Sequence, residues 1–181
     1  MLIGITGRNA SGKTTIIEWL KDKGFGINSC SDSIRNWLRS NNQEITRDNL
    51  IEGGRKLRAM GGPGILAEML LDVIEPGSNH AVDSIRTPAE VEALKKREDF
   101  LLLEIRAPRE LRWQRLLERG RTGDAETFEQ FSEQEESELV AHDESGQALI
   151  ATGKLADVVI HNNGNIEDLH LQLELLMKEY S

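Results

Sequence analysis

The chain has 181 residues, enough for one domain with a buried core, and its apolar (38%) and charged (29%) contents are ordinary for a soluble globular protein. A formal net charge of −9 argues against a general nucleic-acid or anionic-membrane binder, and no apolar run is long enough to span a bilayer. The single cysteine, Cys30, cannot form an internal disulfide, and no basic leader follows Met1. We therefore expect a cytoplasmic protein with one domain over residues 1–181.

Short apolar runs alternate with segments of helical periodicity along the first half of the chain. The patterns predict strands over residues 2–6, 27–30 and 80–83. They predict helices over residues 14–23, 33–39 and 46–60, and a further helix that reaches about residue 74. Ser31-Asp32 and Thr46 are suitable N-caps for the second and third helices, and the glycine-rich segment 61–64 separates the last two.

The second half continues the same alternation. Thr87-Pro88 opens a helix, and residues 100–105 are nearly all apolar, as in a strand buried on both faces. The patterns then predict helices over 108–119, 126–140 and 145–152, a strand over 157–161 and a closing helix over 166–180. This order indicates an α/β fold in which helices cover both faces of one parallel sheet.

Residues 7–14 match the phosphate-loop pattern G-x-x-x-x-G-K-[ST] and lie between a predicted strand and a predicted helix. Glycines let successive backbone N–H groups point inward at phosphates, and the helix start adds its positive dipole end. We expect Lys13 to reach the β- and γ-phosphates of ATP, and the Thr14 hydroxyl to bind Mg²⁺. The predicted nucleotide contacts in this segment are Gly7, Arg8, Asn9, Ala10, Ser11, Gly12, Lys13, Thr14 and Thr15.

Asp83 ends an apolar strand and is followed by Ser84-Ile85-Arg86. A carboxylate at the end of a neighbouring strand lies beside the phosphate loop, where it can bind Mg²⁺ through water or orient an acceptor. Arg86 would then face phosphate oxygens, which suit its planar guanidinium. The alternatives are a helix N-cap for Asp83 and a surface ion pair for Arg86.

Asp32 and Arg35 are three residues apart and therefore share one face at the start of a helix. Such a pair can hold an acceptor, with the carboxylate accepting from a hydroxyl and the guanidinium binding a phosphate. A plain N-cap is an equally good reading of Asp32. Arg55 and Arg58 precede the glycine-rich break and are candidates to close over the acceptor. These residues define an expected acceptor-binding region over about 31–75.

Arginines crowd the end of one predicted helix and the loop after it, at positions 112, 115, 119 and 121. Guanidinium groups stabilise the charge that phosphoryl transfer spreads over oxygens. We expect a lid over about residues 119–140, with Gly120 and Gly123 as hinges and with Arg115 and Arg121 as the phosphate contacts. The alternative is that these arginines only stabilise the helix, because cations near a helix C-terminus interact favourably with the helix dipole. The acidic segment 126–138 reads as a solvated helix face.

Asn162-Asn163-Gly164 follows the last predicted strand at the same edge of the sheet. Its backbone and amide groups could contact adenine, and Asn163 is our candidate. Asn-Gly is also common turn chemistry, so a simple turn remains the alternative.

Taken together, these motifs resemble the nucleoside monophosphate kinase group of P-loop kinases, in that family's order and over most of the chain. More closely, the chain is similar to adenylate-kinase-like and dephospho-coenzyme-A-kinase-like proteins. The resemblance implies a five-stranded parallel sheet of order 2-3-1-4-5, a mobile acceptor-binding region and a lid. Asp83 and Arg86 are one residue closer together than in adenylate kinases.

We expect an ATP- and Mg²⁺-dependent kinase acting on a small nucleotide-like acceptor, with a nucleoside monophosphate as the leading candidate. A hydroxyl acceptor is the alternative: dephospho-coenzyme A, a modified nucleoside, or a hydroxymethylated pyrimidine in DNA. Hydroxyl chemistry gains from a base, and Asp32 or Asp83 is available. A regulatory ATPase is the alternative of another class. The sequence does not distinguish a monomer from a homodimer.

Overall fold

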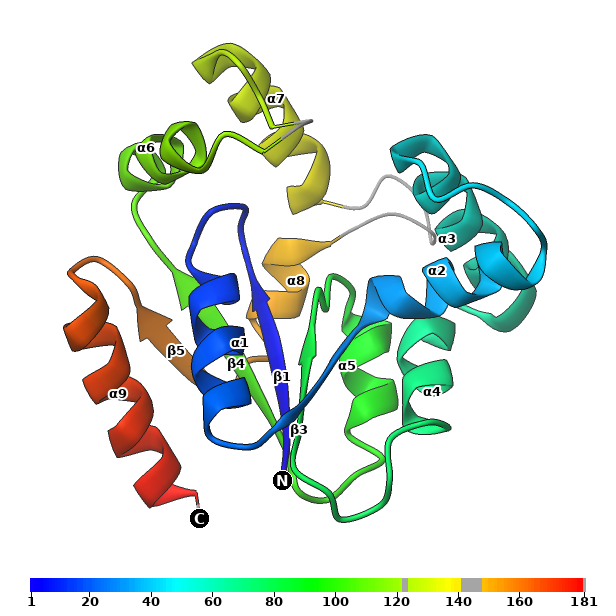
Figure 1. Cartoon of the computed structure of the whole chain (residues 1–181), viewed down its shortest axis with the longest axis horizontal. Helices are drawn as coiled ribbons and strands as arrows, with labels where there is room; N and C mark the ends of the chain where they lie inside the picture. Colours follow the sequence, from blue (N-terminus) through cyan, green and yellow to red (C-terminus); the bar gives the residue numbers. More distant parts are fainter. Residues whose placement is uncertain (122–123, 141–147, 181) are drawn as a thin grey trace.

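Five parallel strands form one sheet in the order β2-β3-β1-β4-β5, which confirms the expected 2-3-1-4-5 order (Figure 1). The computed structural model describes residues 1–121, 124–140 and 148–180. The strands are β1 (Leu2–Gly7), β2 (Gly26–Ser29), β3 (His80–Asp83), β4 (Phe100–Arg106) and β5 (Val158–His161).

The register of the strands places the functional segments at one edge of the sheet. Ser29 at the end of β2 lies opposite Asp83 at the end of β3, and Gly7 at the end of β1 lies opposite Ile105 of β4. Because all strands run in the same direction, the segments that follow them emerge together at this carboxyl edge. The fold thus brings residues from distant parts of the sequence to one place.

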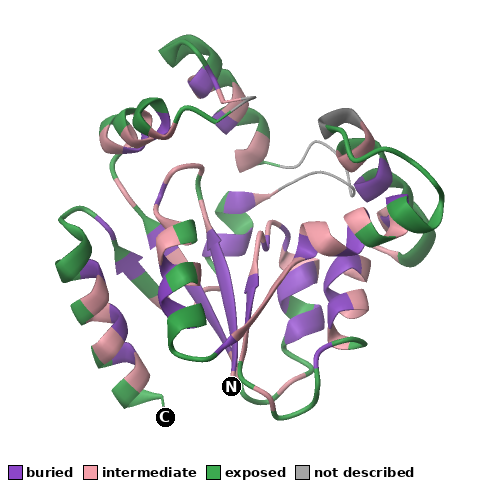
Figure 2. Ribbon diagram, viewed as in Figure 1, coloured by how far each residue is buried: buried purple, intermediate pink, exposed green. Residues whose placement is uncertain are grey.

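Two hydrophobic layers sandwich the sheet, one on each face. Helices α1 and α9 pack on one face, around Ile16 and Leu173, while α2 to α5 pack on the other, around Leu38 and Leu94 (Figure 2). The first five helices are α1 (Lys13–Asp22), α2 (Cys30–Ser40), α3 (Arg47–Gly61), α4 (Ile65–Leu71) and α5 (Pro88–Leu94). The others are α6 (Arg109–Arg119), α7 (Phe128–Leu139), α8 (Leu149–Gly153) and α9 (Ile166–Glu179).

Helix α2 begins earlier than the sequence patterns predicted. Its N-cap is Ser29, not the expected Ser31-Asp32 pair, and Cys30 lies in the helix instead of in a strand. The reason is a capping box: the Ser31 N–H donates to the Ser29 hydroxyl at 3.3 Å, and the Asp32 carboxylate accepts from the Ser29 N–H at 2.9 Å. The buried Cys30 adds apolar contact at the first turn.

Other helix boundaries agree with the cap residues read from the sequence. Thr46 caps α3, which ends at Gly61 within the glycine-rich segment, and Thr87 caps α5 with Pro88 in its first turn. Part of the helix expected over 145–152 lies outside the described residues, as does Gly123; α8 covers the rest. Among the described helices, none has both the length and the apolar character needed to cross a bilayer.

Candidate active site at the carboxyl edge of the sheet

The phosphate loop adopts a backbone path that its glycines make possible. Gly7 has φ +141° and Gly12 has φ +105°, both in the region that favours glycine. A Cβ at Gly7 would lie 2.5 Å from the Ile105 carbonyl oxygen, and a Cβ at Gly12 would overlap the amide nitrogen of Asn162. Both glycines are therefore required by space as well as by conformation.

Lys13 lies at the start of α1, and its ammonium group points back into the loop. Its Nζ donates to the carbonyl oxygens of Gly7 at 2.8 Å and Arg8 at 2.9 Å. Removal from water lowers the Lys13 pKa to about 8, although the nearby Asp83 carboxylate opposes the shift. The Ser11 hydroxyl is buried and has no hydrogen-bond partner among the described residues. This set of donors matches the chemistry of a phosphate site.

An asparagine that we did not single out holds the loop in place. The buried Asn162 donates to the Ser11 carbonyl at 2.9 Å and accepts from Arg115 at 3.3 Å. Asn163, our candidate for adenine contact, is exposed beside it. The sequence signal for Asn162 was its position directly after a strand. Neighbouring side chains along a strand point to opposite sides, so a difference of one residue decides whether Asn162 or Asn163 points inward.

Asp83 and Arg86 both reach this edge, from the end of β3 and the segment after it. One carboxylate oxygen of Asp83 is buried and accepts no hydrogen bond within the described part of the chain. Arg86 forms an ion pair with Glu138 of α7 at 3.2 Å. The strand-end segment is thereby connected to the expected lid.

The acceptor-side residues divide into contacting and exposed side chains. Arg35 donates to Asp32 at 2.8 Å, as the three-residue spacing predicts. Arg58 pairs with Glu90 of α5 at 3.0 Å, and its side chain is 11% exposed. Arg55 lies on the exposed surface of α3. The structure thus places Arg58, but not Arg55, in a buried network next to Arg86.

The arginines of α6 also differ in their surroundings. Arg112 is buried and donates to the Asn9 carbonyl at 3.3 Å. Arg119 donates to the Asn9 side chain at 3.0 Å and pairs with Asp124 at 2.7 Å. Arg121 is exposed. Arg112 and Arg119, which we did not select as phosphate contacts, are therefore the arginines that join the expected lid to the phosphate loop.

The acidic segment 126–138 is only partly the solvated face that we expected. Four of its glutamates are exposed, whereas two face the protein: the exposed ones are Glu126, Glu129, Glu133 and Glu136, and the others are Glu135 and Glu138. Glu135 is 5% exposed and pairs with the buried Arg112, while Arg8 and Arg109 approach its other oxygen at 3.5 Å. The reason is helical spacing: Glu135 and Glu138 follow the buried Phe131 by four and seven residues and so share its face. Aromatic contacts of Phe131 with Trp113 press this face toward α6.

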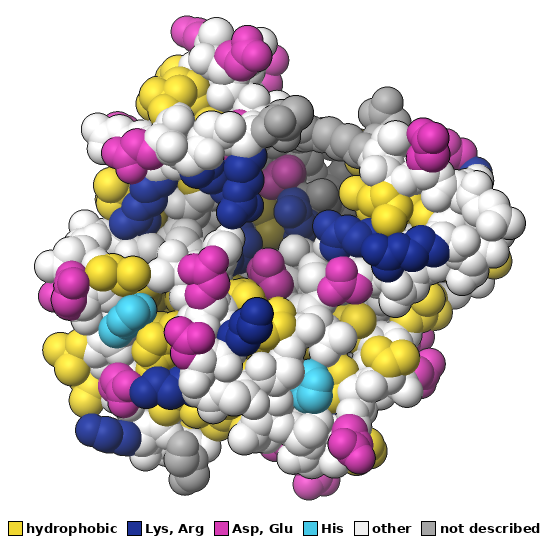
Figure 3. Space-filling view, viewed as in Figure 1, with side chains coloured by type: hydrophobic (Ala, Val, Ile, Leu, Met, Phe, Trp, Pro, Cys, Tyr) yellow, Lys and Arg dark blue, Asp and Glu magenta, His cyan; other side chains and the backbone are white. Residues whose placement is uncertain are grey.

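A cavity of about 200 Å³ lies where these segments meet. Its walls come from the phosphate loop, the segment after β3, and α7 with the residues before it: Gly7, Asn9, Lys13, Arg86, Asp124, Phe131, Gln134, Glu135 and Glu138. Lysine and arginine side chains gather around a hollow between the α6–α7 layer and helices α2–α3 (Figure 3). Within the described ranges, no three histidine, cysteine, aspartate or glutamate side chains cluster as a metal site would require.

Glu90 is a further residue that sequence reasoning missed, and it offers a stability test. Its fully buried carboxylate accepts from the backbone N–H of Arg86 at 2.8 Å and of Thr87 at 3.2 Å, and from Arg58. Both carboxylate oxygens of Glu90 accept hydrogen bonds, whereas a glutamine amide has one accepting oxygen and an NH₂ group that only donates. Glu90→Gln should therefore lower the free energy of unfolding by roughly 1.5–3 kcal/mol. Chemical denaturation measures this loss.

Glu92→Gln is the matched control, at an exposed carboxylate paired with Lys95. It should change the free energy of unfolding by less than about 0.5 kcal/mol. Equal effects of the two variants would contradict the buried network around Glu90.

With the geometry established, comparison with known sequences gives the family. A family model described as an AAA domain matches residues 3–141. A UPF0200 protein of Sulfurisphaera tokodaii is 30% identical, covering 98% of this chain and 96% of that protein. Another, from Methanocaldococcus jannaschii, is 31% identical over 99% and 90% of the two chains. The chain belongs to the UPF0200 proteins and the AAA domain family. This UPF0200 protein carries its phosphate loop inside the matched AAA domain.

Solved structures with the same fold include kinases. This UPF0200 protein superimposes on TT1252 of Thermus thermophilus with a TM-score of 0.61 at 19% identity, over 100% and 98% of the two chains. Shikimate kinase of Aquifex aeolicus gives 0.60 at 15% identity over 99% and 97%. A sugar kinase of Janibacter gives 0.58 at 14% over 98% and 94%. At these identities the likeness shows the fold, which is that of P-loop kinases.

Proposed function

We propose that this UPF0200 protein transfers the γ-phosphoryl group of ATP to a small nucleotide-like acceptor, most simply a nucleoside monophosphate. The observation that carries the proposal is the position of Lys13. Its ammonium is held inside the phosphate loop by two carbonyl oxygens and borders the same cavity as Arg86. Lys13 would thus face the ATP that donates the phosphoryl group, and Arg86 would face the acceptor.

We assign roles to the side chains at the carboxyl edge of the sheet and on the helices beside it; of these side chains, Lys13 and Arg86 line the cavity. The backbone N–H groups of residues 7–14 and Lys13 would hold the phosphate tail of ATP. Arg35, Arg58 and Arg86 would offset the repulsion between donor and acceptor phosphates. Mg²⁺, when bound, would be held by Thr14 and Asp83 and would neutralise part of the phosphate charge. The Asp83 oxygen that lacks a hydrogen-bond partner among the described residues fits that role.

Arg115 and Arg119 complete the donor side. Arg115 contacts Asn162 and Arg119 contacts Asn9, so both extend from α6 toward the phosphate loop. Removal from water lowers the pKa of Arg115, and a phosphate oxygen beside it would offset this cost. The exposed Arg55, Arg121 and Asn163 can reach substrate only if the elements that carry them close over it.

A hydroxyl acceptor is the second candidate, and Asp83 is the observation that favours it. A phosphate acceptor requires no base, whereas a hydroxyl gains from a carboxylate that takes its proton. Both oxygens of Asp32 are engaged, one by the Ser29 N–H and one by Arg35, but one oxygen of Asp83 has no partner in the described residues. Asp83 is therefore the better base in this structure.

An acceptor screen tests the proposal. ATP·Mg²⁺ consumption is followed with each nucleoside monophosphate, with dephospho-coenzyme A and with free nucleosides, and the products are identified by mass spectrometry. We expect at least a tenfold stimulation by one class and a product heavier by one phosphate. ATP hydrolysis that no acceptor stimulates would overturn the kinase and favour a regulatory ATPase.

The lowered pKa of Lys13 predicts a pH dependence of nucleotide affinity. Free protein loses the Lys13 proton as the pH rises through about 8, whereas phosphate binding favours the ammonium. Affinity for a non-hydrolysable ATP analogue should therefore fall above this pH, with net proton uptake during binding. Calorimetry in buffers of different ionisation enthalpy measures both. Constant affinity from about pH 7 to 9.5 would contradict this role, since linkage requires a change.

The lowered pKa of Lys13 also affects the stability of the unliganded protein, which should rise with pH over the range where nucleotide affinity falls. Between about pH 8 and 10.5 the unfolded chain keeps the Lys13 proton that the folded chain has lost. Stability rises with pH wherever the unfolded state binds more protons. The loss of the Lys13 proton should therefore raise the free energy of unfolding of the unliganded protein toward pH 10. Over the same range it should lower the affinity for the nucleotide.

A further inference from the structure

A second, larger cavity lies beside the Gly7–Arg8 segment. It has a volume of about 370 Å³, within the range of small-molecule sites. Its walls come from the end of β4, the start of α6, Leu139 and α8: Gly7, Arg8, Glu104, Ile105, Arg106, Ala107, Arg109, Arg112, Leu139, Leu149, Ile150, Gly153 and Lys154. Lys13, Arg86 and Asp83 do not line it, and it shares only Gly7 with the wall of the first cavity, so it is a distinct cavity next to the proposed active site.

The cavity carries an excess of positive charge, although the chain as a whole is acidic. Arg8, Arg109 and Arg112 share a single carboxylate, that of Glu135, and Arg8 and Arg109 are each 3.5 Å from it. Lys154 has no carboxylate partner in the ranges that the structure describes. Glu104 is the one acidic residue of the wall, and it is neutralised by Arg106 at 2.6 Å.

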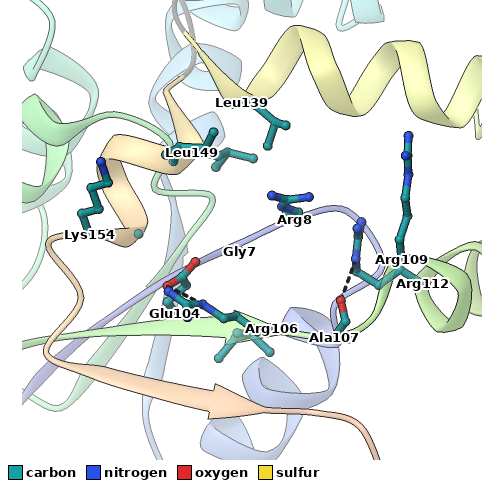
Figure 4. A pocket seen from close by; sticks show the side chains of 13 residues that line it. Gly7, Arg8, Glu104, Arg106, Ala107, Arg109, Arg112, Leu139, Leu149 and Lys154 are labelled. Atoms are coloured by element: carbon teal, nitrogen blue, oxygen red, sulfur yellow. Dashed lines mark hydrogen bonds and ion pairs between the residues drawn. The ribbon is translucent and has the colours of Figure 1, made fainter.

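The close view shows how these groups are arranged (Figure 4). Lys154 and Leu149 extend from α8 on one side, and Arg8 and Arg112 lie on the other, with the Glu104–Arg106 pair below them. Arg112 is fixed: its side chain is 2% exposed and its Nε donates to the Ala107 carbonyl at 3.0 Å. The cationic side chains therefore border the cavity from two directions.

Part of the wall is apolar. Leu149 is buried, and Leu139, Ile105 and the exposed Ile150 complete this surface. Gly153 brings the α8 backbone close, since a Cβ there would lie 2.5 Å from a carboxylate oxygen of Glu104. An apolar surface beside cations that outnumber the nearby carboxylates suits a molecule with a hydrophobic body and an anionic group.

We propose that this cavity binds a small organic anion, namely a ring or short chain that carries a phosphate or a carboxylate. The apolar body packs on Leu149 and Ile150, while the anionic group pairs with Lys154 and Arg8. Arg8 also belongs to the phosphate loop, and its carbonyl accepts from Lys13. The cavity therefore shares Gly7 and Arg8 with the phosphate loop, and any coupling between binding of the anion and binding of the nucleotide must be reciprocal.

Binding of three probes to the full chain tests the proposal by calorimetry and ligand-observed NMR. Phenyl phosphate and benzoate carry the same ring with different anionic groups, and inorganic phosphate carries no ring. We expect one or both ring compounds to bind at least about tenfold more tightly than inorganic phosphate, because burial of the ring adds roughly 1.4 kcal/mol or more. The tighter of the two identifies the anionic group.

Variants locate the site. Lys154→Glu and Ile150→Glu should each weaken binding of the ring compound about tenfold or more. Lys178→Glu and Leu171→Glu introduce the same charges at an exposed lysine and an exposed aliphatic residue of α9, and should leave binding unchanged. Lys13→Ala should weaken it by less than about threefold, since Lys13 does not line this cavity and contacts Arg8 only through the backbone carbonyl. Thermal unfolding confirms that each variant is folded.

Three results would overturn the proposal. Loss of binding in Lys13→Ala would place the probe in the phosphate loop. Equal weakening by Lys154→Glu and Lys178→Glu would make the effect one of overall charge. Absence of binding by either ring compound up to about 20 mM, a free energy near −2 kcal/mol, would show that the cavity takes no such ligand. None of these results depends on ATP turnover, so they do not affect the proposed kinase.

Discussion

Replacing Lys13 with alanine should abolish phosphoryl transfer while the chain stays folded. The ammonium is the cationic side chain that the phosphate loop holds by two of its own carbonyl oxygens, at 2.8 and 2.9 Å. Loss of one preorganised donor at the transferring group lowers turnover by roughly 10²–10³-fold. We expect that loss in ATP consumption with the best acceptor, and weaker binding of a non-hydrolysable ATP analogue.

The stability of the same variant separates a chemical role from a structural one. Because removal from water already lowers the Lys13 pKa to about 8, the unliganded fold gains little from this charge. The melting temperature should therefore stay within a few degrees of wild type, a range that corresponds to about 1 kcal/mol. Lys178→Ala, at an α9 lysine, is the matched control. Turnover near the wild-type rate in Lys13→Ala would overturn the assigned site.

Replacing Gly12 with alanine should both destabilise the protein and prevent nucleotide binding. Gly12 has φ +105°, where a side chain costs about 1–2 kcal/mol. The new Cβ would also overlap the amide of Asn162, which donates to the Ser11 carbonyl at 2.9 Å. With that hydrogen bond lost as well, we expect a total destabilisation of about 3 kcal/mol.

Gly24 provides a control of the same backbone class. It has φ +87°, and a Cβ there would meet no atom within 4 Å. Gly24→Ala should therefore show the conformational cost alone, about 1 kcal/mol, with nucleotide binding unchanged. Denaturant unfolding and calorimetry with an ATP analogue measure both variants. Equal effects at the two glycines would show that the contact with Asn162 does not hold the loop.

Sequence patterns located the phosphate loop and the end of β3 because these features are local. The loop is a continuous motif after a strand, and Gly7, Lys13 and Asp83 lie where that motif and the strand pattern require. The sheet order came from the resemblance that those motifs support, and β2-β3-β1-β4-β5 confirms it. Caps at Thr46 and Thr87 were also local, and both agree with the structure.

The supporting residues could not be found in the same way, since their partners are distant in sequence. Asn162 contacts a residue 151 positions away, Glu90 joins Arg58 across 32 positions, and Arg112 meets Glu135 across 23. Each is a polar side chain that reads as exposed until packing buries it. Glu135 looked solvated because its neighbours are acidic, and the burial of Phe131 one turn earlier decided otherwise.

The sequence by itself thus determined the phosphate loop of this UPF0200 protein, because backbone conformation and residue type suffice to form such a loop. The tertiary structure alone decided which polar groups contact that loop and which side chains line the two cavities. The physical reason is that burial and pairing depend on which elements pack together, and a charge buried beside a partner behaves differently from the same charge in water.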